Sequence, residues 1–366
     1  MKKLKIAVYA ICKNEEQFID KWMDSMQEAD LVVVADTGST DQTVEKLKSR
    51  GAHVYNIKVD PWRFDVARNI SMNFVPEDVD VCVVTDLDEI FEPGWRDKIE
   101  KAWTEETTRL KYMFTWTFNP DGTRGSTFWK GKIHRRHGFR WVHPVHEVLY
   151  YYGSDLEKTV WDNTIQLNHF PDNTKSRGQY LPLLELAVKE DPDYVVNVFY
   201  LGREYMYYEM FDKCIETLNN YLLMPAASWI DQRSASMRYI ARAYKQKGIH
   251  EEAKKWLYKA IAEAPHLREP YVEMAKFAHL DKDWPRVYHM VEEALKIKSK
   301  KASYMNEAFA WNHTIYDLGA LSCYNLGLIQ KSYEFAKIAT ELAPGDERLE
   351  NNLNIIEKIW ISKKDQ

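Results

Sequence analysis

The chain has 366 residues, of which 45% are hydrophobic and 29% are charged, and its formal net charge is −5. This length and composition are typical of a globular protein with room for two domains and a large core. The slight negative charge gives no general signal for nucleic-acid binding, although it does not exclude a local basic groove.

The four cysteines, Cys12, Cys82, Cys214 and Cys323, are far apart in the sequence. They lack the spacing of a zinc site, so we expect buried thiols in a reducing compartment. No apolar run approaches the length of a membrane span, and the short run near the N-terminus lacks the cleavage site of a signal peptide. We therefore expect a cytoplasmic protein.

Short β-branched runs alternate with helical patterns in the first part of the chain. We expect strands at residues 5–12, 31–35, 53–59 and 79–85, and helices at residues 16–27, 43–50 and 64–74. Strands that alternate with helices predict parallel βαβ units. The sequence therefore predicts a Rossmann-like α/β domain with a mostly parallel central sheet.

The last of these strands runs into an acidic stretch, Thr85-Asp86-Leu87-Asp88-Glu89. Ligands of open α/β sheets bind just beyond the carboxyl ends of the strands. Clustered carboxylates also need a cation to offset their repulsion, and a divalent metal would supply one. The alternative is an acidic loop or cap before a helix near Pro93, and this stretch alone does not decide between the two.

The loop at residues 36–43 lacks the glycine spacing of a dinucleotide-binding fold and the lysine of a P-loop. Gly38 allows a tight turn there, and Asp36 and Asp41 could serve only as turn and cap residues. If this sheet binds a diphosphate, its charge must be neutralised elsewhere. A metal held by the acidic stretch would do so.

Four motifs in this order resemble family 2 glycosyltransferases of the GT-A fold. They are Cys12-Lys13-Asn14-Glu15-Glu16, Asp36-Thr37-Gly38-Ser39-Thr40-Asp41, Trp62-Arg63-Phe64-Asp65 with Ala67-Arg68-Asn69, and Thr85-Asp86-Leu87-Asp88-Glu89. The resemblance spans about the first half of the chain. It implies a nucleotide-sugar donor, most simply a UDP-sugar, a divalent metal such as Mn²⁺ or Mg²⁺, and inversion at the anomeric carbon.

The resemblance also implies roles for single residues. Asp36 would contact the nucleotide, near the base or ribose. Asp86 would lie near the ribose and the metal, and Asp88 would be a direct metal ligand. Arg68 would organise the acids or bind the diphosphate. The structural alternative for Arg68 is an ion pair with Asp65 on the same helix.

The acceptor side of the site is expected after this stretch. We expect strands at residues 112–118 and 127–136, followed by His146-Glu147, which matches a His-Glu motif of related enzymes. An inverting transfer needs a base for the acceptor's proton. The resemblance makes Glu147 the candidate base and His146 the second choice. The structural alternative is an ion pair of Glu147 with Arg136 or Arg140.

Three further residues follow an expected strand at residues 164–167. GT-A enzymes often add a histidine to the metal shell, and His169 fits that place. Its imidazole would suit manganese, although a structural role is the alternative. Lys175 and Arg177 lie in the next loop, where they would bind the diphosphate or simply face solvent.

From about Tyr180 onward, helical patterns with small residues at fixed places replace the strands. Residues 234–265 fit a tetratricopeptide unit, and further units begin near residues 201, 271 and 327. We therefore predict a GT-A catalytic domain at residues 1–178 and an all-α helical repeat domain at residues 179–366. Such repeats expose a concave surface that binds a peptide or partner, braces the catalytic domain or joins two subunits in a homodimer.

A transferase followed by such repeats resembles peptide-modifying glycosyltransferases, so the favoured acceptor is a peptide or protein. Lipopolysaccharide, another saccharide and a nucleic-acid base are the alternative acceptors. Two other functions stay open at this point. One is a nucleotidyltransferase on a related sheet, and the other is a non-catalytic repeat scaffold with a vestigial nucleotide-binding domain.

Overall fold

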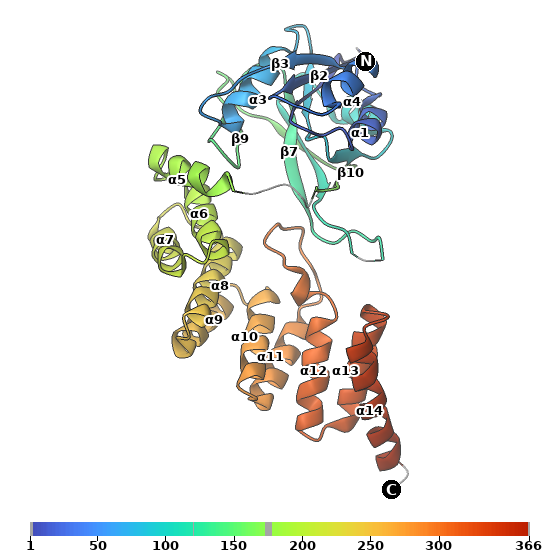
Figure 1. Ribbon diagram of the computed structural model, residues 1–366, viewed down its shortest axis with the longest axis vertical. Coiled ribbons are helices and arrows are strands. Elements are labelled where there is room, and N and C mark those ends of the chain that lie inside the picture. The colour runs from blue at the N-terminus through green and yellow to red at the C-terminus, as the bar shows by residue number, and fades with distance from the viewer. Residues whose placement is uncertain (1–2, 120, 173–177, 365–366) are drawn as a thin grey trace. The chain divides into compact units, whose positions relative to one another are not determined.

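The computed structural model describes residues 3–119, 121–172 and 178–364 (Figure 1). The chain forms two compact units, Met1–Glu190 with Ala302–Tyr304, and Asp191–Lys301 with Met305–Gln366. The predicted boundary at residue 178 lies before helix α5 (Tyr180–Glu190), whereas the two units divide after it.

The first unit is built on an eight-stranded sheet in the order β3-β2-β1-β4-β7-β6-β10-β5. Its strands are β1 (Ile6–Cys12), β2 (Leu31–Asp36), β3 (His53–Asn56), β4 (Val81–Val84), β5 (Glu89–Phe91), β6 (Arg109–Thr115), β7 (Thr127–Arg135) and β10 (Thr159–His169). Strands β3, β2, β1 and β4 are parallel to one another, as β6 is to β10. Strand β7 is antiparallel to both of its neighbours, and β5 is antiparallel to β10.

Helices cover both faces of the parallel strands because the side chains of β1 alternate between two cores. Ile6, Val8 and Ala10 pack into one core with residues of α1 (Ile19–Met26) and α4 (Trp95–Ala102). Ala7 and Tyr9 pack into the other with residues of α3 (Phe64–Asn73) and of a separate ribbon, β8 (Phe139–Val142) and β9 (Val148–Tyr151). A sheet buried on both faces explains the continuous apolar runs of its strands.

The parallel register brings the ends of three strands to one edge of the sheet. Cys12, the last residue of β1, lies beside Asp36, the last residue of β2. Tyr9 lies beside Val84, the last residue of β4, so the acidic stretch begins at the same edge. Helix α2 (Thr43–Ser49) follows the loop that leaves this edge after β2. This is the edge at which a ligand of a parallel sheet is expected.

The predicted α/β alternation is confirmed through β4, with differences of a few residues at element ends. Three strands were not predicted: β5, β8 and β9. The antiparallel β7 also lies between β4 and β6 in the sheet, which sequence order does not reveal.

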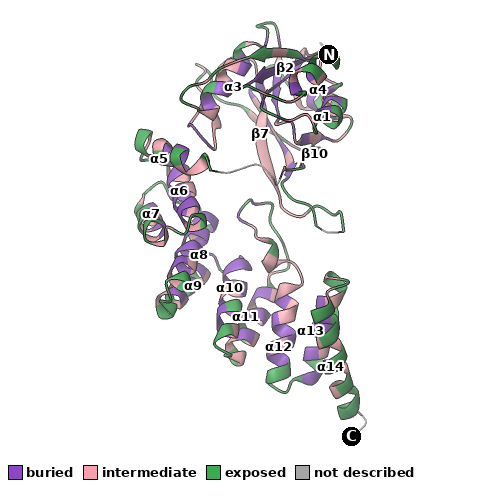
Figure 2. Cartoon of the chain, viewed as in Figure 1, coloured by how far each residue is buried: buried purple, intermediate pink, exposed green. Residues whose placement is uncertain are grey.

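The second unit is all helical, and its helices pack in consecutive pairs (Figure 1). They are α6 (Val195–Tyr207), α7 (Phe211–Leu223), α8 (Ile230–Gln246), α9 (His250–Glu263), α10 (Glu269–Leu280), α11 (Trp284–Lys296), α12 (Thr314–Asn325), α13 (Ile329–Leu342) and α14 (Glu347–Lys364). Helix α8 is buried along most of its length (Figure 2). Gly202 shows why small residues are needed between paired helices, since a Cβ there would lie 2.5 Å from Leu218 of α7. The predicted helical repeat architecture is confirmed.

A segment at residues 297–313, which includes the short 3₁₀ helix Ala308–Ala310, interrupts the repeats between α11 and α12. Its Glu307 accepts hydrogen bonds from Arg238, at 2.6 Å, and from Arg242, both on α8. Its Trp311 donates through Nε1 to Glu269 on α10, at 3.0 Å. These bonds fix the end of the segment that carries Glu307 and Trp311 to the repeats, whereas its residues Ala302–Tyr304 belong to the first unit.

The four cysteines are buried and free, as predicted. Burial raises the pKa of Cys82 and of Cys214 to about 12, so neither is suited to act as a thiolate. Within the described ranges, no helix has both the length and the apolar character needed to cross a membrane.

Candidate active site

Arg68 is the centre of the candidate site. Its Nη2 donates to Asp86 Oδ1 at 2.6 Å, and its Nε donates to Glu147 Oε1. Burial alone would lower the pKa of Arg68, but the two carboxylates raise it above its usual value. Arg68 therefore ties the acidic stretch after β4 to the loop between β8 and β9. The suggested ion pair of Arg68 with Asp65 is wrong, because Asp65 pairs with Arg63 instead.

Glu147 is likewise not paired with Arg136 or Arg140. The guanidinium of Arg136 donates to the carbonyl of Val75, and Arg140 is exposed and forms no ion pair with any described residue. The predicted His-Glu motif thus lies beside the predicted acidic stretch, joined to it through Arg68. Sequence spacing could not show this contact, since residues 68 and 147 are far apart in the chain.

Two lysines on β7 also face the acidic stretch. Lys130 Nζ lies 2.5 Å from Glu89 Oε1, and Glu89 Oε2 accepts the backbone N–H of Asp86 at 3.0 Å. Lys132 Nζ lies 3.8 Å from Asp86 Oδ2. Burial would raise the pKa of Asp86, but Arg68 and these lysines lower it well below its usual range. Sequence analysis missed both lysines, although two lysines at alternate places on a strand inside the sheet are an unusual pattern.

Asp88 and His169 form a second pair at the same edge. His169 Nε2 lies 3.3 Å from Asp88 Oδ2, and its Nδ1 lies 3.2 Å from the carbonyl oxygen of Trp116. The imidazole also stacks on the Trp116 ring, with 4.3 Å between ring centroids and 13° between planes. Burial would lower the pKa of His169, but the hydrogen bond to Asp88 raises it above its usual value. The structure thus brings Asp88 and His169 together, and their role as metal ligands stays a prediction.

These residues offer a divalent cation two protein donors. Among the residues that the structure describes, no group of three or more His, Cys, Asp or Glu side chains is placed to hold a metal ion. Asp86 is turned toward Arg68 and Lys132, which leaves Asp88 and His169 as the available set. Mg²⁺ is commonly held by one or two protein carboxylates together with water and substrate phosphates, and Asp88 supplies one such carboxylate. The donor set therefore fits an ion that shares a diphosphate.

Asp36 accepts hydrogen bonds from the residues of the turn that follows it. Its carboxylate accepts the backbone N–H groups of Gly38, at 3.0 Å, and of Ser39, and it also accepts the Ser39 hydroxyl at 2.5 Å. Asp41 similarly accepts the N–H of Thr43 at 3.0 Å. Both aspartates therefore shape the loop after β2. This shows the turn and cap roles, and the predicted contact of Asp36 with a nucleotide stays a prediction.

The loop that carries His146 and Glu147 has an unusual backbone. His143 and His146 have positive φ angles, 76° and 49°, which cost non-glycine residues about 1–3 kcal/mol each and often occur at functional sites. The backbone N–H of Phe64 donates to the carbonyl of Pro144 at 3.0 Å, which ties this loop to the start of α3. The imidazole of His146 lies 5.7 Å from the ring of Tyr180.

A buried chain of hydrogen bonds lies next to Arg68. Trp141 Nε1 donates to the hydroxyl of Tyr9 at 2.8 Å, and that hydroxyl lies 3.0 Å from His134 Nε2. His134 Nδ1 lies 2.7 Å from the carbonyl of Arg135, which fixes Nδ1 as the protonated nitrogen. Nε2 then accepts from Tyr9. The guanidinium of Arg68 lies 5.2 Å from the centre of the Trp141 ring, so this chain reaches the site.

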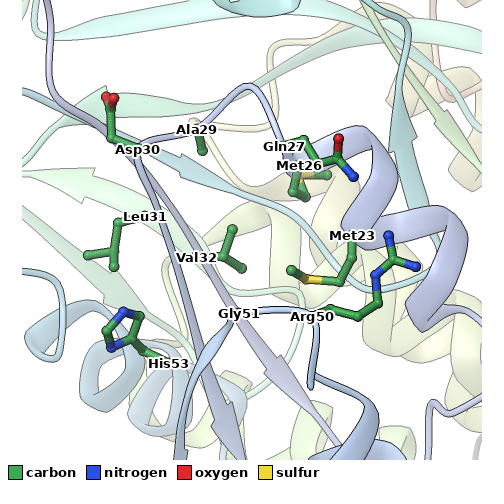
Figure 3. Close-up of a pocket in the computed structure, with 10 residues that line it drawn as sticks. All are labelled: Met23, Met26, Gln27, Ala29, Asp30, Leu31, Val32, Arg50, Gly51 and His53. Carbon is green, nitrogen blue, oxygen red and sulfur yellow. The ribbon is translucent and has the colours of Figure 1, made fainter. Parts of the chain in front are cut away.

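A pocket of about 190 Å³ lies elsewhere in the first unit (Figure 3). Its lining includes Leu31 and His53, the first residues of β2 and β3, so it is at the edge opposite to Asp36. The nearby Arg50 is already paired with Asp20 and Asp24. This pocket is not the candidate site. The predicted diphosphate residues Lys175 and Arg177 lie outside the described residues.

Residues 7–147 match the family model described as glycosyl transferase family 2. These residues, which make up less than half of the chain, are therefore similar to family 2 glycosyltransferases, and this part is called the family 2 domain. The match covers Asp36, Arg68, Asp86 and Asp88 and ends at Glu147. His169 lies beyond the matched residues of the family 2 domain, and the structure alone places it beside Asp88. The family 2 domain and the helical repeats thus correspond to the two predicted parts of the chain.

The solved structures that resemble this chain are distant from it in sequence. No match was found among curated proteins. A crystal structure of MamA is 18% identical, with 44% of this chain and 85% of that chain covered and a TM-score of 0.35. A thermophilic TPR protein in Thermus thermophilus is 18% identical, with 49% and 91% covered and a TM-score of 0.35. These likenesses carry no functional argument.

Proposed function

We propose that this chain is a metal-dependent, inverting glycosyltransferase that transfers a sugar from a nucleotide sugar, favoured as a UDP-sugar, to a peptide or protein side chain. The observation that carries the proposal is the cluster at the carboxyl edge of the family 2 domain. There, Arg68 joins Asp86 to Glu147, and the pair Asp88 and His169 lies at the same edge.

Asp88 and His169 would hold Mn²⁺ or Mg²⁺, and a bound ion supplies Lewis-acid stabilisation to a departing diphosphate. The hydrogen bond from His169 Nδ1 to the Trp116 carbonyl favours this role, because it directs Nε2 toward Asp88. Asp36 and Asp86 would border the nucleoside. The Asp36 carboxylate holds the loop at residues 36–43 in place for that contact.

Glu147 would accept the acceptor's proton during the transfer. Its side chain is 10% exposed and is held by Arg68, which orients one carboxylate oxygen and leaves the second for the acceptor. Its loop lies at the end of α3 that also carries the family motif. His146 is the second candidate for this role, although its ring packs near Tyr180.

The helical unit would bind the acceptor or join two chains in a homodimer. A repeat surface suits an extended peptide, and this supports a polypeptide acceptor over lipopolysaccharide, another saccharide or a nucleic-acid base. The non-catalytic scaffold is disfavoured by the intact pairing of Arg68 with Asp86 and Glu147, because a vestigial site has no need for buried charges. A cytoplasmic location stays a prediction.

The proposal is tested by incubating the full chain with a panel of UDP-sugars, a peptide library and Mn²⁺. We expect release of UDP together with a mass increase of one sugar on the peptide, and we expect chelation of the metal to stop both. Release of pyrophosphate from a nucleoside triphosphate would instead identify a nucleotidyltransferase. If no donor is turned over and UDP with Mn²⁺ causes no thermal shift, the non-catalytic scaffold would be the remaining function.

A further inference from the structure

Strand β7 delivers two cations to the ligand edge of the sheet. The pairing of β7 with β6 shifts register between Ile133 and Lys130, so the two lysines are placed by their contacts: Lys132 lies near the ring of Trp141, and Lys130 lies over the ring of Phe114. The antiparallel register places Ile133 beside Val83 of β4. Lys132 and Lys130 therefore lie next to the residues that follow β4, which are the acidic stretch.

Lys132 differs from the other cations there in its hydrogen bonding. Arg68 donates to Asp86 and Glu147, and Lys130 donates to Glu89 at 2.5 Å. Among the described side chains, the anion paired with Lys132 Nζ is Asp86, whose Oδ2 lies 3.8 Å away, beyond hydrogen-bond distance. The Lys132 side chain is only 15% exposed. A largely desolvated ammonium with unused donors is costly unless an anion binds it.

Lys132 lies between an anionic side chain and an aromatic ring, which both favour a cation. Both Lys132 and Arg68 contact Asp86, and both lie near the ring of Trp141, at 5.7 and 5.2 Å from its centre. Arg68 Nη1 is also buried without a hydrogen-bond partner in the described part of the chain. An anion that entered beside Asp86 would therefore meet the unused donors of Lys132, next to the charge of Arg68.

We propose that Lys132 binds the diphosphate of the nucleotide donor and stabilises it as it leaves. This inference rests on the proposed function, and it assigns to Lys132 the diphosphate contact, while Arg68 serves to hold Asp86 and Glu147. In the transfer, the acceptor forms a bond to the anomeric carbon and gives its proton to Glu147. The bond from that carbon to the diphosphate oxygen breaks, its electron pair passes to the oxygen, and Lys132 donates a hydrogen bond to the diphosphate.

The test compares Lys132→Met and Lys132→Arg with the wild type by titration calorimetry. The probes are UDP and UMP, which share base and ribose and differ by one phosphate, each with and without Mn²⁺. Lys111→Met is the matched control, because Lys111 is a partly buried lysine of the same sheet that stacks on Trp161 instead of an acid. Thermal melting shows which variants are folded.

We expect Lys132→Met to weaken UDP binding by about tenfold to a hundredfold, the range for a hydrogen bond to a charged group, and UMP binding much less. Lys132→Arg should recover most of the loss, and Lys111→Met should bind as the wild type does. A folded Lys132→Met that binds UDP normally would overturn the inference alone. A wild type that binds neither nucleotide would overturn the UDP-sugar donor and the inference together.

Discussion

At the scale of single residues, the carboxylates of the candidate site differ in whether a cationic side chain of the same chain already pairs with them. Arg68 forms ion pairs with Asp86 and Glu147, and Lys130 forms one with Glu89. Among the described residues, Asp88 has only the imidazole of His169, which is neutral once its extra proton is lost. This division makes Asp88 the carboxylate that a metal would reach first, and it gives the carboxylates of the acidic stretch different roles.

Asp88→Ala should therefore remove the part of UDP affinity that depends on Mn²⁺. The substitution deletes one of two protein donors, and the remaining imidazole alone binds a hard cation weakly. Titration of UDP with and without Mn²⁺ measures the effect. Asp97→Ala is the control, since Asp97 is exposed in the first turn of α4. An unchanged Mn²⁺ dependence in Asp88→Ala would reject Asp88 as a ligand.

Glu147→Gln should lower transfer by about 10²–10⁴-fold, the usual contribution of a general base, while UDP still binds. Gln keeps the size of the side chain and can still accept from Arg68, so the loop should keep its position. Single-turnover transfer and UDP titration separate the two effects. Transfer near the wild-type rate would move the role of base to another residue, with His146 tested next by His146→Gln.

The buried His134 should make the first unit less stable in acid. Burial lowers its pKa from the usual 6.5 to about 3, because the charged imidazole is poorly solvated there. Between these two pH values the unfolded chain binds a proton at His134 and the folded chain does not. Its contribution to the free energy of unfolding is therefore complete above pH 6.5 and declines as the pH falls toward 3, by up to about 1.4 kcal/mol per pH unit.

Urea unfolding across this pH range measures the free energy of unfolding of the wild type and of His134→Gln. Other groups titrate in both proteins, so the difference between the two pH dependences reports His134 alone. We expect the wild type to show the steeper decline. His53→Gln is the control, because His53 is exposed at the start of β3. Equal slopes in the wild type and His134→Gln would show that His134 is not held neutral.

At the scale of elements, the sequence predicts what depends on local pattern and misses what depends on pairing. The runs that become β1 and β4 are apolar along their whole length, and the run of β2 is apolar up to its last residue, Asp36; this predicts strands buried on both faces. The ribbon of β8 and β9 is different, since its strands mix buried residues with exposed ones such as Arg140.

The site follows the same rule. Its acids and His169 lie at or near the ends of strands and could be predicted from their motifs. The contact of Arg68 with Glu147 could not, because it depends on the loop between β8 and β9 lying against α3. Lys132 was missed because β7 becomes the neighbour of β4 only through the sheet order.

The inserted segment at residues 297–313 gives a prediction for the helical unit. Glu307 shares Arg238, which is 1% exposed, with Glu273. Glu307→Gln should lower the free energy of unfolding by about 1–3 kcal/mol, the cost of weakening a buried hydrogen bond to a charged group. Thermal and urea unfolding measure it, with Glu347→Gln on the exposed face of α14 as the control. Equal losses in both variants would show that the segment is not fixed through Glu307.

At the scale of the whole molecule, the proposed function divides chemistry and acceptor binding between the two compact units. The acidic stretch, Arg68, Glu147 and His169 all belong to the first unit, and the repeats belong to the second. Helix α5 belongs with the first unit, where Tyr180 lies 6.3 Å from Phe64 and Glu190 pairs with Arg63. A fragment that tests the division must therefore keep α5.

A fragment of residues 1–190 should fold and bind UDP with Mn²⁺ as the full chain does, but it should lose transfer to a peptide. The reason is that it keeps every site residue named above and lacks the repeats that would hold the acceptor. A fragment of residues 1–178 is the comparison, and it should melt at a lower temperature because it loses the contacts of Tyr180 and Glu190. Calorimetry measures binding, and mass spectrometry of the peptide measures transfer. If the folded 1–190 fragment still glycosylates the peptide at the full rate, acceptor recognition lies in the family 2 domain, and the repeats serve to brace it or to join two chains.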